Sequence, residues 1–162
     1  MAWVAGADRL TGDLITSAQW NNYLGATGSL EYLKGRFNWL GASVQVVAQS
    51  NKTSTIAYTD VDLTADTSAT AAFAFLQLHM DLDSVNNGIA TLSVRRNGDT
   101  PTYVPGIRGG AADDATTSRM PWSQLHECIV GLDAGQIFEY TLVITGTIQV
   151  DVYINLLGYI DG

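Results

Sequence analysis

The most informative part of the sequence is Phe138–Ile160, FEYTLVITGTIQVDVYINLLGYI. Apolar residues occupy nearly every even position, and polar residues such as Glu139 and Asp151 occupy most odd positions. A period of two is typical of a β-strand with one buried face, because successive side chains point to opposite sides. Thr145-Gly146-Thr147 marks a turn within the stretch. We therefore predict β-structure here, with the even-numbered residues, Ile160 included, in a core.

The odd positions of this stretch change character near its end. Tyr153, Leu157 and Tyr159 are apolar or aromatic there, so both faces of the strand become apolar. Such a strand must be covered on both sides, either by its own chain or by a neighbouring subunit.

The chain from Ala42 onward has the same β character. Short runs rich in Val, Ile, Thr, Tyr and Phe alternate with turn residues, in Ser43–Gln49, Ser54–Leu63, Ala71–Leu82, Ile89–Arg96, Ser123–Leu132 and Gln136–Ile160. Turns are marked at Asn86-Asn87-Gly88, Asn97-Gly98-Asp99 and Asp133-Ala134-Gly135. Many short strands without helices between them predict a mainly β fold, an antiparallel β-sandwich over residues 42–162.

Two segments of this region depart from simple alternation. In Ala71–Leu82 the apolar residues move from odd to even positions between Phe75 and Leu76, which a β-bulge or burial on both faces would explain. Pro105–Ser118 has no periodicity, and we predict a long exposed loop there.

Residues 1–41 have a helical pattern instead. Thr16-Ser17-Ala18-Gln19 has the form of a capping box, so we predict a short helix from there toward Gly25. A second helix ending at Gly41 is predicted from the spacing of Leu30, Leu33, Phe37 and Leu40. This apolar stripe packs either onto the sandwich or in a short bundle around an oligomer axis.

Charge and composition exclude several classes of partner. The 162 residues contain 16 acidic and 8 basic side chains, with a net charge of −8 and one cysteine. No basic residue occurs between Lys52 and Arg95 or after Arg119, so we expect no binding to nucleic acid or to anionic membranes. No apolar run approaches the roughly 18 residues of a membrane span, and the first ten residues lack the features of a secretory signal. A single cysteine excludes an internal disulfide and a multi-cysteine metal site.

The titratable residues indicate no catalytic or metal motif. His126-Glu127-Cys128 contains a nucleophile and a base, but alternation puts His126 and Cys128 on one strand face, where a cysteine is most often a small buried hydrophobe. Carboxylates occur in pairs at Asp60 and Asp62, Asp81 and Asp83, and Asp113 and Asp114. Such pairs could act as the acid and base of a glycosidase or bind calcium, but the favoured interpretation is that they make the surface soluble. We predict no enzymatic activity, no cofactor and no metal.

The first residues of the chain resemble a segment of known proteins. Trp3-Val4-Ala5-Gly6 and Leu10–Asn21 resemble the N-terminal segment common in tailed-bacteriophage virion proteins. The remainder is similar to the small jelly-roll domains of phage decoration and fibre proteins, at Leu92–Gly98, Leu132–Tyr140 and Gly158-Tyr159. The resemblance implies a jelly-roll-like sandwich, a homotrimer and a place in the virion after synthesis in the host cytoplasm.

The resemblance also implies a role. A short chain beginning at Met1 favours a capsid decoration or cement protein, bound to the major capsid protein or another virion protein. The alternative is a tail or head fibre protein that recognises a host-surface glycan. Three of the four tryptophans lie in the first forty residues, which favours an assembly surface over a sugar-stacking platform. The predicted oligomer or virion interface comprises Trp3, Trp20, Tyr23, Leu30, Leu33, Phe37, Trp39, Leu40, Tyr153, Leu157 and Tyr159.

Overall fold

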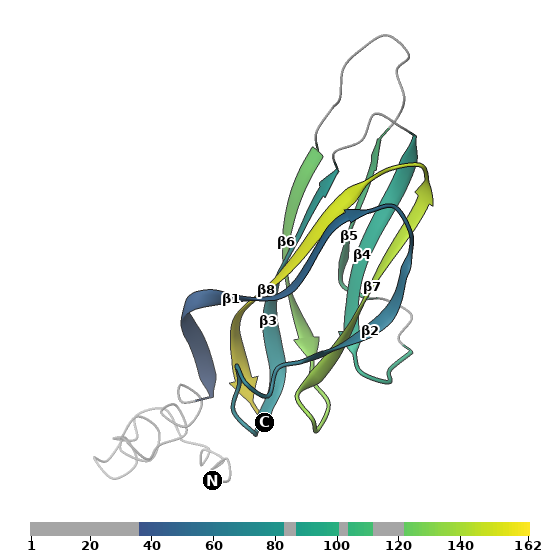
Figure 1. Cartoon of the computed structure of the whole chain (residues 1–162). Helices are drawn as coiled ribbons and strands as arrows, with labels where there is room; N and C mark the ends of the chain where they lie inside the picture. Colours follow the sequence, from purple (N-terminus) through teal and green to yellow (C-terminus); the bar gives the residue numbers. More distant parts are fainter. Residues whose placement is uncertain (1–35, 83–86, 101–103, 112–121) are drawn as a thin grey trace, which may run out of the picture. The chain divides into compact units, whose positions relative to one another are not determined.

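The fold is built from β-strands. A computed structural model describes residues 36–82, 87–100, 104–111 and 122–162 (Figure 1). The strands in these ranges are β1 (Phe37–Lys52), β2 (Ile56–Asp62), β3 (Ala71–Leu82), β4 (Gly88–Arg96), β5 (Gly106–Ala111), β6 (Trp122–Gly131), β7 (Ile137–Gly146) and β8 (Val150–Asp161). None of the described residues is helical. The chain divides into two compact units, residues 1–38 and 39–162, and the second contains the sandwich.

The strands form two four-stranded sheets. Their orders are β1-β8-β3-β6 and β2-β7-β4-β5, and β3 pairs antiparallel with both of its neighbours. Most consecutive strands lie in opposite sheets, so the chain crosses repeatedly between the two layers (Figure 1). The predicted antiparallel sandwich is thereby confirmed.

The core fills the space between the sheets. The alternation in Phe138–Ile160 directs four side chains into this space with none of their surface exposed: Phe138 and Leu142 of β7, and Val152 and Ile154 of β8. The even-numbered residues Leu76, Leu78 and Met80 of β3 are equally buried. Burial of side chains from both layers is the main stabilising contribution to such a sandwich.

A β-bulge in β8 changes which residues near its end face the core. Phe75 pairs with Gly158 while Leu76 pairs with Leu156, so Leu157 is an extra residue in the ladder. Beyond it, Tyr159 lies opposite Ala74 and packs against the core.

The prediction that Ile160 belongs to the core face is therefore wrong. Ile160 lies opposite Phe73, on the outer side of the sheet, because the bulge shifts the alternation by one residue. In β3 the alternation of burial continues from Ala74 to Leu82, so Phe73 and Phe75 stay on the outer face. The register shift predicted at Phe75-Leu76 exists, but its extra residue is in β8.

Two further predictions are corrected. Phe37–Gly41 belongs to strand β1, not to the end of a helix, because β1 hydrogen-bonds to β8 and this pairing outweighs the local helical spacing. The rest of the predicted helices lies outside the described residues.

The predicted loop Pro105–Ser118 contains strand β5, which pairs with β4 and buries Ile107. Its glycines obscured the strand pattern, yet Gly106 is needed because a Cβ there would collide with the backbone carbonyl of Leu92. Residues 112–118 lie outside the described residues.

Asp133 organises the turn between β6 and β7. Its Oδ1 accepts hydrogen bonds from the backbone N–H groups of Gly135 at 2.8 Å and Ile137 at 2.9 Å. Its Oδ2 accepts one at 2.8 Å from Asn97 Nδ2 in the β4 turn. The Ile137 N–H contributes most to lowering the pKa of the Asp133 carboxyl below its ordinary value. Asp62 shows the same effect, because the Thr64 backbone N–H holds its pKa low.

These lowered pKa values predict acid sensitivity. A carboxyl whose pKa is lower in the folded state contributes stability above its unfolded pKa, and that contribution is lost as the pH falls through the folded value. We expect the free energy of unfolding to fall from about pH 5 downward, and Asp133→Asn to make this dependence shallower. Urea unfolding between pH 5 and 2 measures it, with Asp60→Asn as the control. Parallel pH profiles for Asp133→Asn and the wild type would contradict the assignment.

Candidate functional site

The outer side of the β1-β8-β3-β6 sheet carries several large apolar side chains. The register places Phe75 of β3 directly opposite Ile129 of β6, and both point away from the core. Phe73, Leu125 and Ile129 are 46%, 59% and 52% exposed. Because β6 is an edge strand of its sheet, no further described strand lies beyond Leu125 and Ile129. We call the set Trp39, Phe73, Phe75, Leu125, Ile129 and Leu157 the apolar face.

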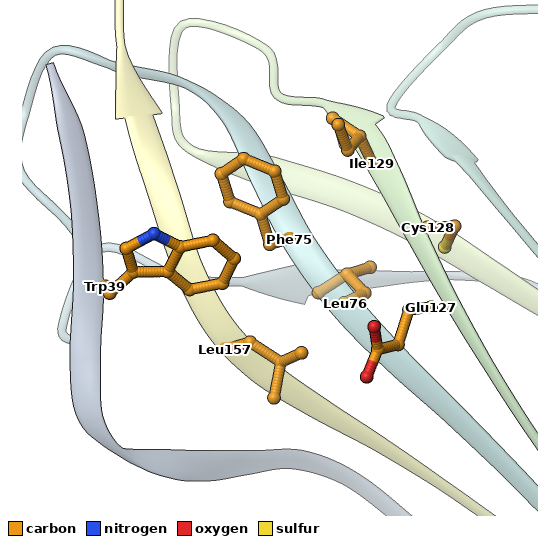
Figure 2. Close-up of a pocket in the computed structure, with 7 residues that line it drawn as sticks. All are labelled: Trp39, Phe75, Leu76, Glu127, Cys128, Ile129 and Leu157. Carbon is orange, nitrogen blue, oxygen red and sulfur yellow. The ribbon is translucent and has the colours of Figure 1, made fainter.

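Trp39 joins the apolar face from β1. Its ring stacks on Phe75, with centroids 4.8 Å apart and an interplanar angle of 24°. The indole nevertheless remains 65% exposed. Figure 2 shows the Trp39 ring turned toward Phe75, with Leu157 beside both. The β8 bulge thus adds an apolar side chain next to the stacked pair.

These side chains surround a small hollow. Its volume is about 140 Å³, and its lining includes Trp39, Phe75, Leu157, Ile129 and Glu127 (Figure 2). Sites for small organic ligands usually have about 300–1,000 Å³. The hollow is therefore better matched to a single side chain of a protein partner, which is how anchor residues enter interfaces.

The predicted interface residues are distributed over several environments. Trp39 and Leu157 come together in the apolar face, whereas Leu40 and Tyr159 pack partly buried against the core. Tyr153 lies on the same sheet, its ring centroid 5.6 Å from that of His79. Phe37, in β1, is exposed. Outside the described residues lie Trp3, Trp20, Tyr23, Leu30 and Leu33.

Four members of the apolar face were missing from the predicted interface. Phe73 and Phe75 had a signal, since they stand at odd positions of a strand whose core residues are even. Leu125 and Ile129 likewise stand at odd positions of their strand, on the same face as Glu127. Only the pairing of β3 with β6 shows that these residues share one surface.

A polar cluster on the same sheet contains the residue types of a catalytic triad. His79 Nε2 lies 3.1 Å from Asp81 Oδ1 and 3.0 Å from Ser123 Oγ. A Ser-His-Asp relay requires the serine and the carboxylate on different ring nitrogens. Here both face the same nitrogen, so the contacts orient the imidazole without assembling that relay. Sequence reasoning did not single out this cluster.

The other candidate residues are a partly buried cysteine and separate carboxylates. Burial raises the pKa of the Cys128 thiol to about 11, so the thiol is protonated and weakly nucleophilic at neutral pH. Within the described ranges, no three His, Cys, Asp or Glu side chains are grouped so as to hold a metal ion. Asp83, Asp113 and Asp114 lie outside these ranges. No helix in the described part of the chain is long and apolar enough to span a membrane.

The outer side of the β2-β7-β4-β5 sheet carries an ion pair together with the exposed side chains of Tyr58, Ile89 and Val143. Arg95 donates from Nε to Glu139 at 2.7 Å, and its guanidinium carbon lies 3.4 Å from the centre of the Tyr58 ring. The Arg95 and Glu139 side chains are only 17% and 12% exposed, so their charges depend on each other.

This ion pair gives a stability prediction. Arg95→Ala is expected to lower the free energy of unfolding by about 2 kcal/mol, because it leaves the carboxylate of Glu139 without its closest cation. The double variant Arg95→Ala/Glu139→Ala should recover part of that loss. Urea unfolding of the single and double variants measures the coupling. A double variant less stable than Arg95→Ala would show that the pair is not coupled in this way.

Comparison with known proteins identifies no family for this chain. The sequence matches no protein-family model and no curated protein. Its fold has a weak likeness to a chain in a solved structure of infectious bursal disease virus Gx strain, with 11% identity and a TM-score of 0.34. The match covers 75% of this chain but only 32% of that chain. A likeness at this level identifies no family, and the architecture above rests on the strand pairing itself.

Proposed function

We propose that this chain is a non-enzymatic structural protein of a virion, a homotrimeric decoration or cement protein that binds the assembled head of a tailed bacteriophage. Its partners are further copies of itself and the major capsid protein or another virion protein. Its location is the outer surface of the capsid.

The architecture supports this proposal. Two four-stranded sheets ordered β1-β8-β3-β6 and β2-β7-β4-β5 have the strand arrangement of a jelly roll, a fold common in capsid domains. The resemblance of Trp3–Gly6 and Leu10–Asn21 to phage virion proteins points to the same class. Fold alone does not assign function, so the proposal depends on the surface.

The apolar face is the observation that carries the proposal. Soluble monomers rarely expose contiguous apolar patches of more than a few hundred Å². Here Trp39 stacks on Phe75, Phe75 lies opposite Ile129, and Trp39 and Ile129 are 65% and 52% exposed. A protein with such a group of exposed apolar side chains is suited to an assembly in which they are covered.

Mass action supplies the mechanism. A protein that binds only the assembled lattice lowers the free energy of that state, by about 2.7 kcal/mol per site when its concentration is 100 times the dissociation constant. The net charge of −8 disfavours attachment to nucleic acid during packaging.

Immunogold electron microscopy tests the proposal. Antibodies raised against the full chain are applied to purified particles of the virus whose genome encodes it. We expect gold particles over the whole head surface. Label confined to fibre or tail tips would overturn the decoration role and favour the glycan-recognising alternative. Absence of label from particles, with the protein detected elsewhere in the lysate, would overturn the virion assignment.

A further inference from the structure

We infer that the apolar face is the surface through which one copy of this chain binds a second copy. This inference deepens the proposed function, on which it rests for the expectation of an oligomer. It assigns the contact between copies to described residues on β1, β3, β6 and β8.

The area of the apolar face is close to what a stable contact between copies needs. The exposed fractions are 65% for Trp39, 59% for Leu125, 52% for Ile129 and 46% for Phe73. At about 150–250 Å² for a large apolar side chain, these four expose roughly 400 Å². A standard interface buries about 800 Å² per partner, of which about 65% is apolar between identical subunits. The partly exposed Phe75 and Leu157 add to the apolar area of this face.

The shape of the face suits contact with another copy of the chain. The hollow of about 140 Å³ lies beside the protruding ring of Trp39 (Figure 2). The same face therefore offers a recess of side-chain size and exposed side chains, such as Leu125, that can enter one. Contacts between identical copies require both features on one molecule.

The charges on this side of the sheet determine how the contact responds to salt. The Asp81 carboxylate is hydrogen-bonded to the His79 ring, and the Asp151 carboxylate accepts a hydrogen bond from the Asn51 backbone N–H. Glu127 is exposed and lines the hollow. Two copies that meet here bring their Glu127 carboxylates toward each other. Added salt should therefore strengthen self-association, whereas it weakens binding to a basic partner.

Sedimentation velocity of the full chain over a range of protein concentrations tests the inference. The wild type should sediment as an oligomer, more strongly associated at high salt, and Glu127→Gln should strengthen association further. Ile129→Lys should raise the dissociation constant at least about 100-fold, because it puts a charge at the centre of the contact. The control is Val143→Lys, whose site is 43% exposed on the other sheet and whose association should equal that of the wild type. Circular dichroism confirms that both variants are folded.

The outcomes separate this inference from the proposed function. A wild-type chain that is monomeric at all concentrations, or equal association of Ile129→Lys and Val143→Lys, would overturn the inference. If Ile129→Lys remains oligomeric but no longer attaches to virions, the face contacts another virion protein, and the inference fails while the proposed function stands. If Ile129→Lys dissociates and the wild-type protein is absent from virions, the inference holds and the proposed function fails.

Discussion

Replacing Phe138 by alanine is expected to lower the free energy of unfolding by about 3–5 kcal/mol. Phe138 is among the largest of the fully buried side chains and lies in β7, between the two sheets. Its removal loses the transfer free energy of a phenyl ring and leaves a cavity that neighbours such as Val61, its partner across the strand pair, cannot fill completely. Since the total stability of a domain is about 5–15 kcal/mol, this variant should lose a large share of the stability of the sandwich.

The matched control lies in the same strand. Val143 of β7 is 43% exposed on the outer face, so Val143→Ala should change the free energy of unfolding by no more than about 0.5 kcal/mol. Urea unfolding of both variants at one protein concentration gives the comparison, because self-association would otherwise shift the midpoint. Equal midpoints for Phe138→Ala and Val143→Ala would show that Phe138 is not in the core.

Gly146→Val is expected to cost about 2–4 kcal/mol. Gly146 closes β7 with a φ of +86°, a conformation that a β-branched residue adopts only with strain. A Cβ there would also collide with the backbone carbonyl of Asn87 and come within 2.8 Å of the Gly88 Cα. The start of β4 would have to shift, which adds an overpacking cost to the backbone strain.

Gly41→Ala is the control for this second prediction. A Cβ at Gly41 of β1 would meet no atom within 4 Å. The substitution should therefore be neutral or stabilise by up to about 1 kcal/mol, through the lower entropy of the unfolded chain. Thermal unfolding of both variants, followed by circular dichroism, measures the difference. A Gly146→Val protein as stable as Gly41→Ala would mean that the β7–β8 turn differs from the one described.

Local patterns predicted much of the sandwich. The strand Ala71–Leu82 has the bounds expected from its composition, and the alternation in Phe138–Ile160 places nearly all of its even residues in the core. Turn residues such as Gly98 and Gly146 have the positive φ values that only glycine tolerates easily. These features depend on neighbours in the chain, so a single sequence carries them.

Features that depend on distant partners could not be predicted. Phe37 and Leu40 have helical spacing but lie in a strand, because β1 pairs with β8, whose residues lie about a hundred positions later. The extra residue Leu157 becomes visible only against its partner strand. The apolar face likewise requires the register that brings Phe75 beside Ile129. The sequence alone marked two of its six members, Trp39 and Leu157, as interface residues.

We expect the apolar face to be covered by protein in the assembled state. Hydroxyl-radical footprinting with mass spectrometry compares the oxidation of individual side chains in the virion-bound protein and in the Ile129→Lys variant free in solution. We predict strong protection of Trp39, Phe73 and Leu125 in the bound protein, with little change at Tyr58 and Val143 on the other sheet. Oxidation of Trp39 and Leu125 at the same rate in both samples would contradict the account.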